Sequence, residues 1–123
     1  MLYFEGDFMT RTEFGIIDDF DPNITYDKYE PEKYNCVVID DDKYINDWWN
    51  ELLLIRTYNM SVKQPQMALS RWGITLLPPD SLPEFLKIVK HDKRVAEDEN
   101  LQRLCGIISI AIDEGKYMIH FGI

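Results

Sequence analysis

The chain has little of what marks several familiar protein classes. Its two cysteines provide no disulfide framework and no metal-ligand spacing. No uninterrupted apolar run approaches the ~18 residues of a membrane span, and no secretory signal opens the sequence. Positive charge is scarce, with 13 Lys and Arg against 22 Asp and Glu, a formal charge of −9. We therefore expect a cytoplasmic protein with reduced cysteines, no cofactor and no membrane or nucleic-acid partner, because nucleic-acid affinity depends on cationic contacts with phosphate.

What remains is an ordinary globular composition. The 123 residues are 46% hydrophobic and 28% charged, enough for one domain with its own core. Residues 1–8 are set apart, because Leu2 to Gly6 resemble a protease-site remnant of an expression tag and Met9 is an alternative start. We expect residues 9–123 to form a single α+β domain.

The order of the expected elements defines the fold class. Four segments have the β-branched and aromatic content or the bounding turn residues of strands: residues 14–17, 36–39, 70–77 and 116–123. Three segments have helical periodicity or capping residues: 43–58, a helix opened by a Ser81–Glu84 capping box, and one from Glu97 to just before Gly115. This order is not a regular strand–helix alternation, so it predicts an α+β fold. We expect a mixed or antiparallel sheet of about four strands packed against about three helices.

The negative charge is concentrated in the first part of the chain. Residues 1–50 hold 13 acids and 4 bases, whereas residues 51–123 hold 9 of each, and five of the seven tyrosines also lie in the first 50. Acids with interleaved tyrosines are suited to a basic protein partner, because tyrosine offers apolar contact area at low entropic cost. Excess surface acid that only keeps the protein soluble is the alternative. The expected partner-binding residues are Asp18, Asp19, Asp21, Tyr26, Tyr29, Glu30, Asp40, Asp41 and Asp42.

A calcium-stabilised module at residues 19–30 is a second hypothesis. Oxygen donors occur at the spacing of an EF-hand loop: Asp19, Asp21, Asn23, the Thr25 carbonyl, Asp27 and Glu30. However, Ile24 occupies the position where the sharp turn requires glycine, and a β-branched residue is strained at positive φ. The pattern is therefore more typical of a solvated acidic loop, and we expect no metal site.

A small enzyme with a crevice near Asp40 or His120 is the third hypothesis. Asp40, Asp41 and Asp42 follow an expected strand, where carboxylates can face a crevice, but capping of the next helix accounts for them more simply. His120 lies on the expected last strand and can face either side of the sheet, and no Gly-x-Ser-x-Gly motif accompanies it. Because no motif completes a catalytic set, we expect no catalytic residue.

In size, acidity, aromatic content and lack of a catalytic motif, the chain resembles the small immunity proteins that bacteria encode beside polymorphic toxins. The resemblance is one of general character, and no family residue is carried over from it. It implies a non-enzymatic protein that binds and blocks a basic toxin domain. Together with the acidic, tyrosine-containing segment, it leads us to expect a binding protein.

Overall fold

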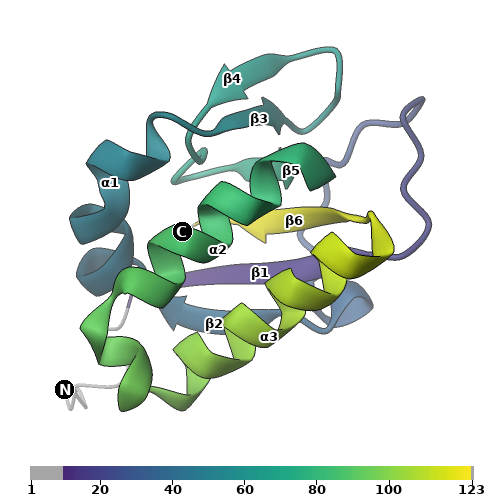
Figure 1. Cartoon of the computed structure of the whole chain (residues 1–123). Helices are drawn as coiled ribbons and strands as arrows, with labels where there is room; N and C mark the ends of the chain where they lie inside the picture. The colour runs from purple at the N-terminus through teal and green to yellow at the C-terminus, as the bar shows by residue number, and fades with distance from the viewer. Residues whose placement is uncertain (1–9, 123) are drawn as a thin grey trace, which may run out of the picture.

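Six short strands pair into one open antiparallel sheet in the computed structural model, which describes residues 10–122 (Figure 1). The order across the sheet is β2-β1-β6-β5-β3-β4. The central strands are largely buried on both faces, as expected for strands covered on both sides. The bounds are β1 (Arg11–Ile17), β2 (Val37–Asp40), β3 (Arg56–Asn59), β4 (Pro65–Met67), β5 (Ile74–Leu77) and β6 (Tyr117–Phe121).

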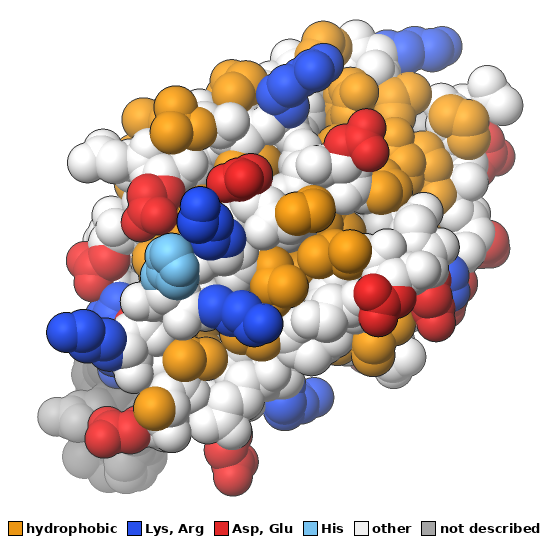
Figure 2. Space-filling model, viewed as in Figure 1, with side chains coloured by type: hydrophobic (Ala, Val, Ile, Leu, Met, Phe, Trp, Pro, Cys, Tyr) orange, Lys and Arg blue, Asp and Glu red, His pale blue; other side chains and the backbone are white. Residues whose placement is uncertain are grey.

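Helices α2 and α3 lie side by side over one face of the sheet, and α1 lies at one end of it (Figure 1). The helices are α1 (Asn46–Leu52), α2 (Leu82–His91) and α3 (Glu99–Glu114). Short helical turns flank them, η3 (Asp41–Ile45), η4 (Pro79–Ser81) and η5 (Lys93–Ala96), and a further one, η2 (Pro31–Tyr34), lies between β1 and β2. Figure 2 shows acidic, basic and hydrophobic side chains interspersed over this helical face. Within residues 10–122, no helix has both the length and the hydropathy required to cross a bilayer.

The longest helix, α3, follows the expected sequence signals closely. Asp98 caps its first turn by accepting hydrogen bonds from the backbone N–H groups of Asn100 and Leu101. Gly115 ends it at φ 64°, a left-handed conformation that glycine adopts without strain. The apolar stripe of α3, which includes Leu104 and Ile108, is fully buried against the sheet. Local signals and tertiary packing therefore agree along this helix.

The opposite face of the sheet, called the outer face here, is covered by chain without helix or strand over much of its length. Residues 18–36, which we call the crossing segment, connect β1 to β2. Phe20 stacks on Tyr117 at 3.7 Å between ring centroids, and Tyr26 packs into a second core with Ile119 and Phe121. The backbone N–H of Tyr26 also donates to the Met60 carbonyl. Buried aromatic rings therefore hold a highly charged segment against the sheet.

The α+β class is confirmed, but the expected count of about four strands is wrong. The helix expected over 43–58 ends at Leu52, and Arg56–Asn59 forms β3 instead. Tyr58 pairs with Leu76 of β5, and this long-range pairing outweighs the local helical periodicity. β4 lies in a stretch where no strand was expected, and its first residue is Pro65, a position where a strand tolerates proline.

Two smaller expectations also differ from the structure. The strand expected over 70–77 begins only at Ile74, because Ser70 to Gly73 form a turn closed by a hydrogen bond from Gly73 N–H to the Ser70 carbonyl. The expected capping box at α2 is absent: the Ser81 hydroxyl donates to the Arg56 carbonyl instead. Ser81 therefore connects α2 to β3, the strand that the sequence pattern did not reveal.

Candidate functional site

The structure does not bring the nine expected partner-binding residues onto one surface. Residues 18–30 follow the Ile17 end of β1, whereas Asp40 lies beside Arg11 at the other end of that strand. A seven-residue strand spans roughly 20 Å, so the two groups are well separated. Two of the nine are also buried, since Tyr26 is 8% exposed and Asp41 is fully buried. Asp18 is also engaged within the fold, because it forms an ion pair with Lys116, whereas Asp19 is exposed.

The three consecutive aspartates have separate structural roles. The Asp40 side chain accepts from the backbone N–H of Lys43 and caps η3, as expected for one of the three. Asp42 accepts a hydrogen bond from the Thr10 hydroxyl. Asp41 forms a buried ion pair with Arg71, whose guanidinium also lies over the Trp49 ring. These contacts account for the aspartates as parts of the fold.

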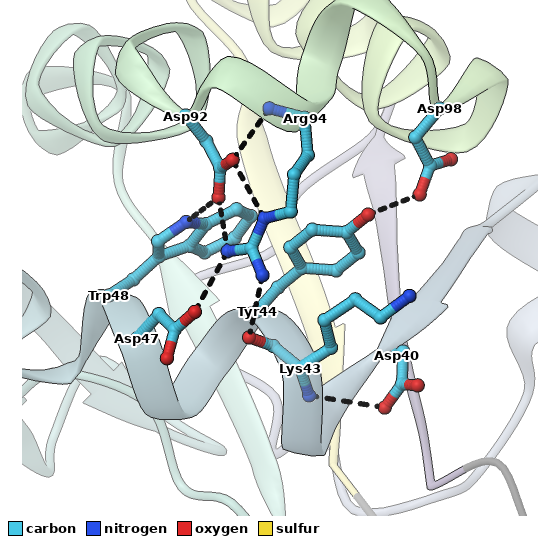
Figure 3. Close-up of polar contacts among 8 residues, drawn as sticks. All are labelled: Asp40, Lys43, Tyr44, Asp47, Trp48, Asp92, Arg94 and Asp98. Atoms are coloured by element: carbon cyan, nitrogen blue, oxygen red, sulfur yellow. Dashed lines mark hydrogen bonds and ion pairs between the residues drawn. The ribbon is translucent and has the colours of Figure 1, made fainter.

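A polar cluster joins η3 and α1 to the connection between α2 and α3 (Figure 3). Arg94 lies over the Tyr44 ring at 4.6 Å and forms ion pairs with Asp92 and Asp47. The Trp48 indole N–H donates to Oδ2 of Asp92, and the Tyr44 hydroxyl donates to the Asp98 carboxylate (Figure 3). The hydrogen bonds and ion pairs of these side chains are therefore formed with one another.

The electrostatics of this cluster favour a structural role. The Arg94 guanidinium holds the pKa of Asp92 well below its usual range, with smaller help from a backbone N–H and the Trp48 indole. Burial, followed by the hydrogen bond to Asp98, raises the pKa of Tyr44 above that of a free tyrosine. Asp92 therefore stays charged and Tyr44 stays neutral near pH 7, so neither group is poised for proton transfer.

His120 lies fully buried in β6 on the helical side of the sheet, between two threonines. Its Nε2 is 2.5 Å from the Thr12 hydroxyl, which reaches the Phe121 carbonyl, and its Nδ1 is 3.3 Å from the Thr75 hydroxyl. These contacts are satisfied by a neutral ring protonated on Nε2. Burial lowers the pKa of His120 to about 3, so the ring is neutral near pH 7. With no exposed surface, His120 cannot contact a substrate.

The proposed calcium ligands are not gathered around a common centre. The Asp21 carboxylate accepts from the Asn23 backbone N–H, and Asp21 N–H donates to the Tyr26 hydroxyl, a local turn that needs no ion. Across the described part of the chain, no group of three or more His, Cys, Asp or Glu side chains is arranged to hold a metal ion. Asp19 and Asp27 are simply exposed.

The outer face holds a groove that the sequence reasoning did not anticipate. It has a volume of about 440 Å³, and Gly73 and Gly122 contribute backbone to its lining. Two aromatic side chains that line it are unusually exposed, Tyr29 at 65% and Trp72 at 78%. Groups of both signs of charge also line it. We call this feature the aromatic groove and define it by Arg11, Glu13, Tyr29, Trp72, Ile74 and Phe121.

Tyr29 is held in the groove by two neighbours. Its ring meets Phe121 edge to face, with the centroids 5.3 Å apart, and its hydroxyl donates to Oε1 of Glu13. This hydrogen bond is the largest of the effects that raise the pKa of Tyr29 to about 12. Tyr29 therefore remains a neutral hydrogen-bond donor at any physiological pH.

Trp72 is positioned by the residue that precedes it. The Arg71 guanidinium is held by Asp41 and Asn46, which anchors the turn of residues 70–73 to η3 and α1. On the other side, Gly122 N–H donates to the Gly73 carbonyl, and a Cβ at Gly122 would overlap the Arg71 backbone. A rigid turn thus carries an exposed indole. The sequence did not single out Trp72 as a binding residue, because position 72 fell within the strand expected over 70–77.

Both cysteines are partly buried. Burial, followed by the negative charges of Glu13 and Glu32, raises the pKa of the Cys36 thiol to about 12, and burial also raises that of Cys105. A thiol with a raised pKa is a poor nucleophile, so neither cysteine suggests catalysis.

Comparisons with protein-family models, curated proteins and solved structures found no match for this chain. Its function is therefore inferred from the residues described above.

Proposed function

We propose that this protein is a non-enzymatic binding module that docks a basic protein partner on its outer face. The observation that supports this most directly is the exposure of Tyr29 and Trp72 at the aromatic groove. Large aromatic rings rarely stay this exposed without a use, and Trp and Tyr are the residues most enriched at binding hot spots.

The two rings supply contact area at low entropic cost. An aromatic side chain buries ~150–250 Å², so covering Trp72 contributes on the order of 3–5 kcal/mol, an upper figure that the cost of association reduces. Arg71 already holds the neighbouring backbone, and Glu13 holds Tyr29. Binding should therefore cost little entropy for ordering the backbone next to the two rings.

Charge favours a basic partner. The crossing segment carries six acids against Lys28 and Lys33, a formal charge of −4, and it supplies Tyr29 to the groove. Such a surface steers a positively charged protein during diffusional encounter, and the association rate should fall as salt screens it. Asp19, Asp21 and Glu30 stay in this proposal. Asp18 is paired with Lys116, and Asp40, Asp41 and Asp42 contribute at most to the long-range electrostatic field.

The resemblance to immunity proteins suggests one class of partner, a basic toxin domain. Bound by its acidic outer face, the protein would inhibit such a domain by covering its cationic site. Inhibition of this kind needs no reactive group on the inhibitor, which agrees with the burial of His120 and Asp41.

The test is selection of a random peptide library against the intact protein. We expect enrichment of basic peptides whose affinity falls at least tenfold in Trp72→Ala and whose association rate falls as salt is raised. Leu54→Ala is the matched control, because Leu54 is also an exposed apolar side chain but lies outside the groove. Selected peptides whose affinity is unchanged in Trp72→Ala, or a library from which no peptide is enriched, would contradict the proposal.

A further inference from the structure

We propose that the aromatic groove accepts an arginine side chain of the partner, with the face of its guanidinium on the exposed rings of Tyr29 and Trp72 and its N–H groups on the Glu13 carboxylate. This inference rests on the proposed docking function and adds the chemistry of its anchor residue.

The protein itself shows twice how it holds a guanidinium. Arg94 lies over the Tyr44 ring and pairs with Asp92, and Arg71 lies over the Trp49 ring and pairs with a buried carboxylate. In both places one face of the guanidinium meets an aromatic ring while its N–H groups meet a carboxylate. This arrangement combines cation–π attraction with charge-assisted hydrogen bonds.

The groove offers the same two groups without the cation between them. Tyr29 and Trp72 supply rings, and Glu13 supplies a carboxylate that uses only Oε1 to accept from Tyr29. Among the residues that the structure describes, neither Glu13 nor Arg11 forms an ion pair, and Arg11 lies over no aromatic ring. The second oxygen of Glu13 is therefore left for an incoming donor.

Arginine fits this site better than lysine. Its planar head stacks on an aromatic face and presents N–H groups to a carboxylate at the same time, whereas an ammonium is a strongly hydrated point charge. Its apolar stem can lie along the exposed indole of Trp72. Arg11, which also lines the groove, is the one cation there that opposes an incoming guanidinium, so its removal should strengthen binding.

The experiment titrates the full-length protein with N-acetylarginine methylamide and follows the indole N–H resonances by NMR, with that of Trp72 assigned through Trp72→Phe. We expect millimolar binding that shifts the Trp72 signal, and about tenfold weaker binding of the neutral citrulline analogue. N-acetyllysine methylamide should bind less tightly than the arginine compound. Arg11→Gln should tighten arginine binding.

Glu13→Gln keeps an acceptor for Tyr29 but removes the charge, so it should lower arginine affinity about tenfold while leaving citrulline unaffected. Glu51→Gln, which removes an exposed acid from α1, is the matched control and should change neither affinity. Equal binding of arginine and citrulline, or an unchanged affinity in Glu13→Gln, overturns the inference. Library-selected peptides that need Trp72 but contain no arginine overturn it too, while leaving the docking function standing.

Discussion

The crossing segment differs sharply from residues 52–79, which we call the acid-free stretch. The crossing segment holds six acids and two bases, whereas the acid-free stretch holds no acid at all and the bases Arg56, Lys63 and Arg71. The stretch also carries four of the seven large hydrophobic side chains exposed in the described part of the chain: Leu53, Leu54, Met67 and Trp72.

The two regions are also attached to the sheet by different means. The acid-free stretch forms β3, β4 and β5, so backbone pairing holds it, and the Arg71 ion pair anchors its last turn. The crossing segment forms no strand and is held by Phe20, Tyr26 and Tyr34. A surface rich in charge can thus be ordered by a few buried rings beneath it. The aromatic groove lies where the two regions meet, since each contributes one exposed aromatic ring.

The largest effect is expected from removing the anchor of the acid-free stretch. Asp41→Ala leaves the mostly buried Arg71 guanidinium without its carboxylate, which should lower the free energy of unfolding by about 3–5 kcal/mol. Urea denaturation measures this change. Asp42→Ala is the control, because Asp42 is exposed and should cost less than about 1 kcal/mol. Equal losses in the two variants would show that the ion pair is not the anchor.

Removing the anchor of the crossing segment should have a somewhat smaller effect. Tyr26→Ala opens a cavity in the outer core and deletes the hydroxyl that accepts from Asp21 N–H, for a loss of about 3 kcal/mol. Hydrogen exchange should show faster exchange across residues 18–30 with little change in β5. Asp27→Ala, an exposed neighbour, should leave exchange unaltered. Uniform loss of protection throughout the sheet would refute a separately anchored segment.

A pH dependence tests the link between the two halves of the sheet, because His120 connects Thr12 of β1 to Thr75 of β5. Its pKa is about 3 when folded and near 6.5 when unfolded, so the folded state excludes a proton that the unfolded state binds. Stability is therefore full above pH 6.5 and is lost as pH falls toward 3. Between pH 6.5 and 5 the loss should be about 2 kcal/mol.

Urea titrations at several pH values measure this slope, which should disappear in His120→Gln and persist in the exposed control His91→Gln. Asp92 does not contribute to the slope between pH 6.5 and 5. Because its pKa is lowered in the folded state, the stability that it adds is lost only below about pH 4. A slope unchanged in His120→Gln would mean that other groups titrate there.

The smallest effect concerns the exposed aliphatic side chains of the acid-free stretch. Leu54 is 80% exposed, so Leu54→Ala should change the free energy of unfolding by less than about 0.5 kcal/mol. Leu52→Ala, two residues earlier in the buried core, should cost about 2–5 kcal/mol. Comparable costs for both would show that Leu54 packs in solution.

Some elements could be predicted because their signals are local. The apolar stripe of α3, its end at Gly115 and the aspartate cap that follows β2 each depend on neighbours within a few residues. β3 and β4 could not be predicted, because they exist through pairing with distant strands. Of the residues that line the aromatic groove, only Tyr29 was among those expected to bind a partner, whereas Trp72 and Glu13 were not.

The sequence alone determined the α+β class, the position of α3 and the concentration of acids before α1, since composition and periodicity are properties of the chain. Only the tertiary structure decided that Asp40 to Asp42 lie apart from the other acids and that Tyr29 and Trp72 line one groove. Strand order and register create those neighbours, and hydrogen bonding between distant segments leaves no local trace in the sequence.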